Sequence, residues 1–201
     1  EEVKKQLLQE GLLLASMRSN YVPLFFGACF SITCPFLVME YAPSFSLLAV
    51  LEANVVGVAA MRVKKKKEEI ERLFGCVQML QPWENRWQLL VDIVVGLSVL
   101  HRHIDAPIVH GSVNSLHVLL DKTTIRAKLC GFTESLSSVS SLSDTPVSEE
   151  LIEKGKKKDL KELALVLVEI AHMKPLKSLP VPSPRAGGAE LKEEGSGLGG
   201  L

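Results

Sequence analysis

The stretch Val109-His-Gly-Ser-Val-Asn-Ser-Leu-His-Val-Leu-Leu-Asp121 decides how this chain folds. Its apolar ends enclose a polar centre with two histidines, two serines and an asparagine. A second apolar run, Ile125 to Phe132, follows almost directly. Short apolar runs rich in β-branched residues and bounded by polar residues are typical of strands around a loop. The sequence therefore predicts short strands over Ile108 to Leu120 and over Ile125 to Phe132, around a loop.

Helical patterns lie on both sides of this segment. Trp83 to His103 carries a strong apolar repeat of helical period, and Asp159 to His172 predicts a final buried helix. Glu1 to Met17 has the alternating apolar and charged faces of an amphipathic helix. Leu47 to Leu80 favours helix but is interrupted by the run Lys64 to Lys67, which with its following glutamates is typical of a solvated helix face.

Two apolar runs near the beginning, Val22 to Phe30 and Phe36 to Tyr41, predict a hairpin. A membrane hairpin is the alternative, because Tyr21 to Met39 contains no charge and Ala42 to Met61 contains one. Three prolines cut these runs into strand-sized pieces, and buried strands also produce long uncharged runs. We therefore favour strands and expect no membrane partner.

Composition limits the function further. The 201 residues suffice for one domain or part of a larger one, and 47% of them are hydrophobic. Twenty-three basic residues balance twenty-three acidic ones, so no overall charge attracts nucleic acid. The four cysteines lack metal-ligand or disulfide spacing, which favours a reducing, cytoplasmic compartment. The chain begins with Glu and shows no export signal, so we expect an excerpt.

Two segments lack any periodic pattern. Ser135 to Ser148 is rich in serine and predicts a mobile loop, and Pro180 to Leu201 is dominated by Pro, Gly and Ser and predicts disorder.

The order of these elements, together with five strings, resembles a protein kinase of the tyrosine-kinase-like group from its helix C to its helix F. Phe36 to Pro43 matches the fifth strand and hinge, and Asp92 to His101 matches helix E. Val109 to Asp121 matches the catalytic loop, Lys128 to Thr133 the D-F-G segment, and Asp159 to Glu169 helix F. The resemblance implies an α+β, partial protein-kinase-like fold, with helix C and strands 4 and 5 of the N-lobe and a mostly helical C-lobe as far as helix F.

This resemblance also implies a domain organisation. Residues 1–175 form the partial kinase-like domain, of which 1–41 belong to the N-lobe and 42–175 to the C-lobe. Residues 48–82 form an extended helix D region, longer than usual, and 176–201 form a disordered tail.

The catalytic positions depart from the family pattern. A kinase catalytic loop of the form H-R-D-L-x-x-x-N uses its Asp as the base and its Asn to hold magnesium, and the D-F-G Asp holds the metals that bridge the phosphates. Ser112, His117 and Gly131 stand at these positions, and Asn114 replaces the usual Lys. Losing several such groups implies a loss of at least about 10³-fold in rate.

The framework positions are retained. The resemblance implies that Leu14, Leu24, His110 and Phe132 stack in one buried column, the regulatory spine, with Asp159 beneath His110. It implies that Glu10 is the helix C Glu and that Glu150 stands near the A-P-E position. It also implies a nucleotide pocket. Met39 is its gatekeeper, Glu40, Tyr41 and Ala42 form the hinge, and Leu119 forms the pocket floor.

Plainer interpretations stand beside these roles. Without the surrounding string, His110 would be an ordinary core histidine at a strand end. Cys130 is more simply a buried small hydrophobe than a reactive thiol, because nothing nearby in the sequence would lower its pKa. The histidines at 101, 103 and 117 do not make a metal site on spacing alone.

We therefore predict a catalytically inactive kinase-like domain that binds other signalling proteins, an active kinase among them, and needs no cofactor. One alternative is an active Ser/Thr kinase that uses ATP and Mg²⁺, with Asp121 or Glu134 supplying the missing carboxylate. Another is the kinase-homology module of a receptor guanylyl cyclase, which the pair His110-Gly111 and the string Gly27-Ala28-Cys29 also resemble. We further expect marginal stability, with apolar side chains partly in water at Leu7, Leu12, Leu14, Leu163, Val166 and Ile170.

Overall fold

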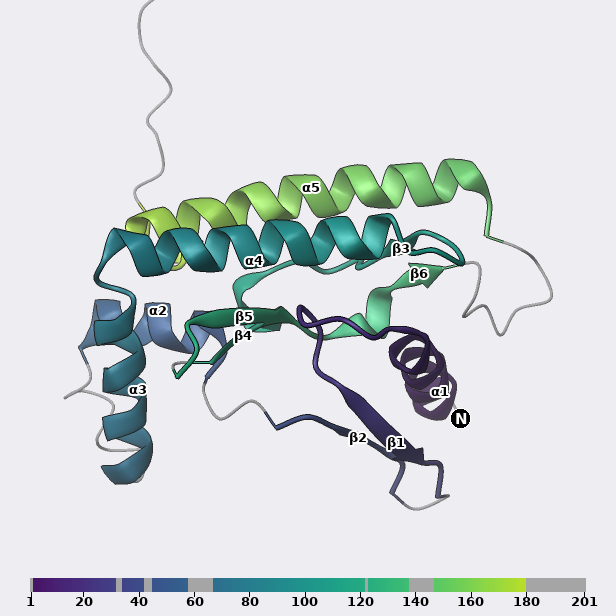
Figure 1. Cartoon of the computed structure of the whole chain (residues 1–201), viewed down its shortest axis with the longest axis horizontal. Coiled ribbons are helices and arrows are strands. Elements are labelled where there is room, and N and C mark those ends of the chain that lie inside the picture. The colour runs from purple at the N-terminus through teal and green to yellow at the C-terminus, as the bar shows by residue number, and fades with distance from the viewer. Residues whose placement is uncertain are drawn as a thin grey trace, which may run out of the picture.

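Two long helices lie side by side, and the other elements are arranged around them (Figure 1). The computed structural model describes residues 2–31, 34–41, 45–57, 67–121, 123–137 and 147–179. The long helices are α4 (Trp83–His101) and α5 (Glu149–His172). The hairpin of β4 (Val118–Asp121) and β5 (Arg126–Leu129) packs against α4.

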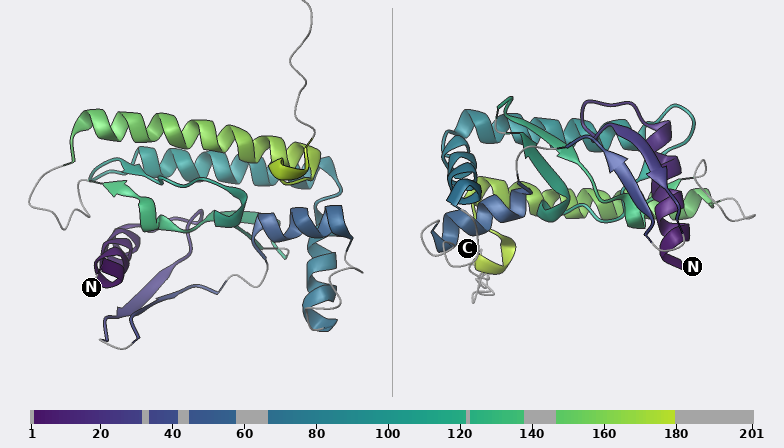
Figure 2. Two further views of the ribbon diagram at one scale, coloured as in Figure 1. Left: turned by 180° about the vertical axis from the view of Figure 1, so that it is seen from behind. Right: turned by 90° about the horizontal axis from the view of Figure 1, so that it is seen from below.

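The remaining elements lie at two ends of this layer. Helix α1 (Glu2–Ser16) and the hairpin of β1 (Phe25–Cys29) and β2 (Phe36–Met39) lie at one end, below the β4–β5 hairpin in Figure 1. Helices α2 (Leu47–Val56) and α3 (Lys67–Met79) lie at the other end, as the view from below in Figure 2 also shows. The mixed α+β architecture predicted from the sequence is present.

The described strands form three separate antiparallel pairs. They are β1–β2, β4–β5, and β3 (Ile108–Val109) with β6 (Leu136–Ser137). The predicted strand region from Ile108 to Leu120 is interrupted by the 3₁₀ helix η2 (Ser115–His117). A second 3₁₀ helix, η3 (Phe132–Glu134), follows β5. Asn114 causes the interruption, because its side-chain oxygen accepts hydrogen bonds from the backbone N–H groups of Leu116 and His117.

Helix α5 begins ten residues earlier than the sequence pattern predicts. Ser148 caps its first turn by accepting a hydrogen bond from the backbone of Leu151, and Glu149 and Glu150 place negative charge at the helix start. Glu150 therefore lies inside the helix that continues to Asp159, and not in a separate segment before it. The Lys-rich stretch between them lacks the apolar repeat from which the helix could have been predicted.

The core lies between α4, α5, α2 and the β4–β5 hairpin, with α1 closing one end. Leu14, Leu163, Val166 and Ile170 are buried, so the prediction that they lie partly in water is wrong. These side chains occupy the inner faces of α1 and α5. The exposed apolar residues of the two helices lie on their outer faces, and they include Leu12, Leu160, Leu165 and Val168.

The hydrophobic segment near the beginning of the chain forms the β1–β2 hairpin and not membrane helices. Within the described ranges, no helix is both long enough and apolar enough to cross a bilayer. The interaction expected of the Lys-Glu face is present at Lys67, whose Nζ lies 3.9 Å from the Glu71 carboxylate. Residues 138–146 and the predicted disordered segment 180–201 lie outside the described residues.

Candidate functional site

A buried carboxylate holds the polar loop that follows β3. Asp159, on the inner face of α5, accepts hydrogen bonds from the backbone N–H groups of His110 and Gly111, each at 2.8 Å. Its Oδ2 also lies 2.8 Å from Nε2 of His101 at the end of α4. Asp159 is completely buried, and three polar contacts compensate for the removal of its charge from water.

Two neighbouring α5 side chains reach the same loop. Glu162 accepts a hydrogen bond of 2.9 Å from the backbone of Val113, and Lys158 donates to the carbonyl of Gly111. Gly111 has a φ of 83° and lies so close to Glu134 that a Cβ would be 2.2 Å from its carbonyl oxygen. Only glycine therefore fits at position 111.

The His110 ring is buried and neutral. It lies 4.9 Å from the Phe132 ring, between centroids. Its Nε2 donates to the carbonyl of Cys130 at 3.0 Å, and its Nδ1 accepts from the backbone N–H of Ser112 at 3.3 Å. Burial lowers the pKa of His110 to about 4. The ring therefore packs between Phe132 and the loop and is hydrogen-bonded on both of its nitrogens.

The predicted buried column is incomplete, because one of its four members is exposed. Leu14, His110 and Phe132 are buried, but Leu24 is 47% exposed, so the expectation of a fully buried column is wrong at this residue. Leu24 precedes β1 and lines a shallow hollow with Leu14 and Phe25.

The loop positions that correspond to the catalytic base, the usual lysine and one magnesium ligand are hydrogen-bonded to one another. Nδ1 of His117 lies 2.7 Å from the carbonyl oxygen of Ser112, to which it donates. The Asn114 amide nitrogen lies 3.2 Å from both the carbonyl and the hydroxyl oxygen of Ser112. These contacts turn the His117 ring inward, and the polar groups of the loop are hydrogen-bonded to one another.

The His117 ring packs directly against Gly131. Gly131 is in the left-handed region, with φ of 79° and ψ of 58°. A Cβ at this position would lie 2.6 Å from Cδ2 of His117, closer than such atoms approach. The ring therefore fills the space into which a side chain at position 131 would project. Mg²⁺ requires oxygen ligands in near-octahedral geometry, so the residues at these positions do not fit the ion.

Glu10 of α1 contacts the segment after Gly131. It accepts hydrogen bonds from the backbone N–H of Phe132 at 3.1 Å and from the hydroxyl of Thr133 at 3.4 Å. The resemblance assigned Glu10 as the helix C Glu. In the structure its carboxylate connects α1 to the candidate site.

The predicted hinge is joined to β5 by an ion pair. The Glu40 carboxylate lies 2.6 Å from Nζ of Lys128 and accepts a hydrogen bond of 3.1 Å from the backbone of Leu24. The hydrogen bond from Lys128 holds the pKa of the Glu40 carboxyl below its usual value. Met39 and Tyr41 are exposed, Leu119 is half-buried, and Ala42 lies outside the described residues.

The two candidate substitute carboxylates have structural partners. Asp121 closes the β4–β5 turn by accepting from the backbone of Thr123 and the hydroxyl of Thr124, each at 2.8 Å. Glu134 lies 3.7 Å from Nζ of Lys158. Among the described residues, no group of three or more His, Cys, Asp or Glu side chains is arranged to hold a metal ion.

Cys130 remains in its thiol form at neutral pH. Burial, with a smaller contribution from the Glu10 charge, raises the pKa of Cys130 to about 11. A thiol with so high a pKa is a poor nucleophile. The side chain is half-buried, and its high pKa agrees with the part of the interpretation that Cys130 is not a reactive thiol.

Sequence reasoning missed the role of the buried carboxylate of Asp92. Asp92 of α4 accepts from Nε of Arg126 at 2.8 Å and from the backbone of Ala127 at 3.0 Å, which fixes β5 to the helix. A charged residue in the apolar repeat of α4 was the available signal. Glu162 was missed as well, although its place three residues after Asp159 puts the two carboxylates on the same face of α5.

A family model described as protein tyrosine and serine/threonine kinase matches residues 1–163. The chain belongs to the protein kinase superfamily. The match covers the anchored loop, the His117 and Gly131 positions and the first half of α5. Helix α1, the β1–β2 hairpin and the α4–α5 layer are therefore parts of a kinase-like fold.

Plant receptor kinases are similar to this kinase-like chain. A salt tolerance receptor-like cytoplasmic kinase of Oryza sativa subsp. japonica is 27% identical over 132 residues, which are 66% of this chain and 32% of the relative. A receptor protein-tyrosine kinase of Arabidopsis thaliana is 27% identical over 119 residues, 59% of this chain and 10% of the relative. A wall-associated receptor kinase-like protein of Arabidopsis thaliana is 26% identical over 137 residues, 68% of this chain and 16% of the relative. The chain thus spans less than a third of the length of each.

Proposed function

We propose that this kinase-like domain does not transfer phosphate and acts as a binding or scaffold module in phospho-signalling. The observation that carries the proposal is the packing of the His117 ring against Gly131, where a Cβ would lie 2.6 Å from the ring. An active kinase needs an oxygen ligand at both positions. Here one position offers an imidazole and the other no side chain.

The base position supports the same conclusion. Ser112 offers a hydroxyl where an active kinase has a carboxylate, and that hydroxyl lies 3.2 Å from the Asn114 amide nitrogen. Phosphoryl transfer depends on positioning and on neutralising charge, and the protein supplies little covalent chemistry of its own. A site without these charges retains the framework of the family but lacks its means of catalysis.

The retained framework suits a binding module. Asp159, Glu162 and Lys158 hold the loop by hydrogen bonds, and Glu10 holds the segment after Gly131, so we expect the surface around the site to be ordered without a bound metal. An ordered surface loses little entropy when it binds a partner. The similarity to plant receptor kinases supports a partner among signalling proteins, and a cytoplasmic location is part of this proposal.

Phosphate transfer itself tests the proposal. Purified chain is incubated with Mg²⁺ and γ-labelled ATP, with a generic protein substrate and without one. We expect no label above a blank without enzyme. A restored variant that combines Ser112→Asp, His117→Asn and Gly131→Asp shows whether the chain can support transfer when the family groups are present. Sustained turnover by the unaltered chain would contradict the proposal.

The active-kinase alternative has one specific observation in its favour. The Glu134 backbone packs against Gly111, and its carboxylate lies near the same loop through Lys158. If the alternative held, turnover would require Mg²⁺ and would be lost in Glu134→Gln, Asp121→Asn or Ser112→Ala. The guanylyl cyclase module gains no support from the relatives reported above.

A further inference from the structure

Helix α4 is apolar on its outer side as well as on its inner side. Ile93 and Leu97 are buried in the core, whereas Trp87 is 58% exposed and Val91 and Val94 are also exposed. A helix that is apolar all round is normally buried all round. The outer side of α4 therefore has the composition of a surface that another chain covers.

One line of residues runs along this outer side for the whole length of the helix. At alternating spacings of four and three residues, its members are Glu84, Gln88, Val91, Val95, Ser98 and Arg102. Residues at these spacings share one helix face, and the same spacing is the one by which two helices pair. Val95 and Ser98 are half-buried, and the other four are exposed. We call this line the α4 seam.

The α4 seam is complementary to itself when two copies run antiparallel. An acidic residue stands at its beginning and a basic residue at its end, each is followed inwards by a polar residue, and two valines form the centre. In an antiparallel pair, Glu84 of one copy lies opposite Arg102 of the other. In the same register Val91 lies opposite Val95. A parallel pair would place like charges against each other at both ends, which disfavours that orientation.

Both charges at the ends of the seam are available for such pairing. Glu84 and Arg102 are exposed, and neither has an ion pair with any residue that the structure describes. Glu84 lies in the first turn of α4 and Arg102 caps its end, so each charge also has the sign that the helix dipole favours at its position. A twofold-symmetric pair would form this contact twice.

A hollow beside the seam fits the exposed tryptophan of a second copy. The hollow has a volume of about 510 Å³ and is lined by residues of α4 and its end between Val94 and Ile104. In the antiparallel register, Trp87 of the second copy lies at the level of Val99, near the middle of this hollow. A tryptophan that fills a pocket on its partner is typical of the residues that dominate binding energy.

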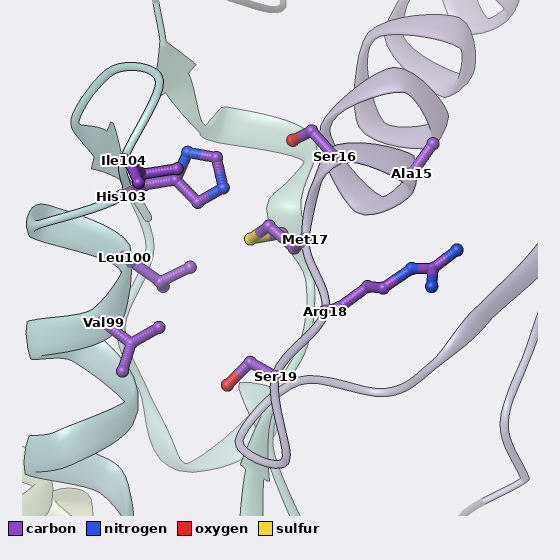
Figure 3. Close-up of a pocket in the computed structure, with 9 residues that line it drawn as sticks. All are labelled: Ala15, Ser16, Met17, Arg18, Ser19, Val99, Leu100, His103 and Ile104. Atoms are coloured by element: carbon purple, nitrogen blue, oxygen red, sulfur yellow. The ribbon is translucent and has the colours of Figure 1, made fainter.

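The neighbouring side of this end of α4 is turned towards the same chain. Figure 3 shows Leu100 and His103 pointing from α4 towards the segment that contains Met17. Arg102 is not among the residues that line that second hollow, whereas Val99 lines both. Val99 therefore marks the boundary between the side of α4 that its own chain covers and the side that carries the seam.

We propose that the α4 seam is an interface between two copies of this chain, which pair as an antiparallel, twofold-symmetric dimer. Ion pairs join the two ends, valines pack at the centre, and Trp87 of each copy fills the hollow of the other. One helix from each copy makes a small interface, so we expect a dissociation constant in the micromolar range. The seam does not involve the site around Gly131, so this proposal does not depend on catalytic inactivity.

Self-association of the whole chain tests the proposal. Sedimentation velocity is measured from about 1 to about 100 µM, a range that brackets the expected dissociation constant. We expect a concentration-dependent shift from monomer to dimer, and a dissociation constant about tenfold or more weaker in Trp87→Ala. Phe74→Ala, at another exposed aromatic side chain on α3, is the control and leaves association unchanged. A chain that stays monomeric over the whole range would overturn the proposal.

Charge reversal tests the antiparallel register. Glu84→Arg places two arginines at each end of the interface, and Arg102→Glu places two glutamates there, so each variant alone should associate about tenfold or more weakly. An equimolar mixture of the two variants restores unlike charges at both ends, and so do both substitutions in one chain. We expect dimers to return in both cases. Recovery in the mixture requires contact between copies, and it would not follow from repair of a folding defect.

Two further results would contradict the assignment. A dimer that Trp87→Ala and both charge reversals leave intact would show that the copies meet through another surface. Charge-reversal variants that retain the circular dichroism of the unaltered chain, but do not associate when mixed, would exclude the antiparallel register and with it the proposed interface.

Discussion

The two ends of one loop have opposite characters. At the first end, His110 and Gly111 are held by the buried carboxylate of Asp159 at 2.8 Å. At the second end, His117 turns inward and packs against Gly131. The groups that position the backbone are therefore present at the first end, whereas groups that would bind metal are absent at the second end. This kinase-like fold thus maintains its loop by hydrogen bonds with α5, with the residue after β5 and within the loop itself, without the groups that would bind metal.

The largest effect is expected at the anchored end. Asp159→Ala leaves the N–H groups of His110 and Gly111 buried without an acceptor, and removes the partner of His101. We expect a loss of about 3 to 5 kcal/mol in the free energy of unfolding, measured by urea denaturation. Asp105→Ala, at an exposed aspartate, should cost less than about 0.5 kcal/mol. Similar losses in both variants would show that Asp159 is not an anchor.

The second end is tested by filling its glycine. Gly131→Ala forces a Cβ into the His117 ring and adds the strain of a positive φ, so we expect a loss of about 2 kcal/mol. In a His117→Ala background the steric part disappears and about 1 kcal/mol remains. Gly27→Ala, where a Cβ would meet nothing within 4 Å, is the control. Identical costs of Gly131→Ala in both backgrounds would refute the packing.

The pH dependence of stability tests His110, which lies at the anchored end and packs against Phe132. Burial lowers the pKa of His110 to about 4, whereas an unfolded histidine titrates near pH 6.5. The unfolded chain therefore binds the proton first, so stability is fully present above pH 6.5 and declines as the pH falls towards 4.

We expect about 2 kcal/mol of this contribution to be lost between pH 7 and pH 5. Denaturation at pH 5, 6 and 7 is compared with that of His110→Phe, in which the contribution is absent. Parallel pH profiles of the two proteins would mean that His110 titrates normally in the folded state.

The smallest effect is expected at the hinge. Glu40→Gln removes the ion pair with Lys128, but 40% of the Glu40 side chain is exposed and water screens the pair. We expect a loss below about 1 kcal/mol, partly suppressed in 0.5 M salt. A loss as large as that of Asp159→Ala would show that the hinge, and not α5, holds the domain together.

Local patterns predicted much of the fold. The repeat from Trp83 to His103 matched α4 within two residues, and the order of motifs placed Asp159 against the loop. Helix α5 was longer than predicted because its first turns contain lysines and no apolar repeat. The Glu40–Lys128 pair joins residues 88 positions apart, and no local signal announces such a contact.

The state of the metal positions was harder to predict. The residue types at Ser112, His117 and Gly131 indicated missing ligands. The inward turn of the His117 ring depends on the Ser112 carbonyl and on the left-handed backbone of Gly131, which belong to different segments. The sequence identified what was lost, and the three-dimensional packing shows what replaces it.

Metal binding at this site tests the central claim most directly. Isotope-labelled chain is titrated with Mn²⁺ in the presence of ADP, and paramagnetic broadening of the backbone amide signals is followed by NMR. We predict no selective broadening of His117, Gly131 or Phe132, and selective broadening of this segment in the His117→Asn, Gly131→Asp variant. Selective, saturable broadening of these signals in the unaltered chain would contradict the account.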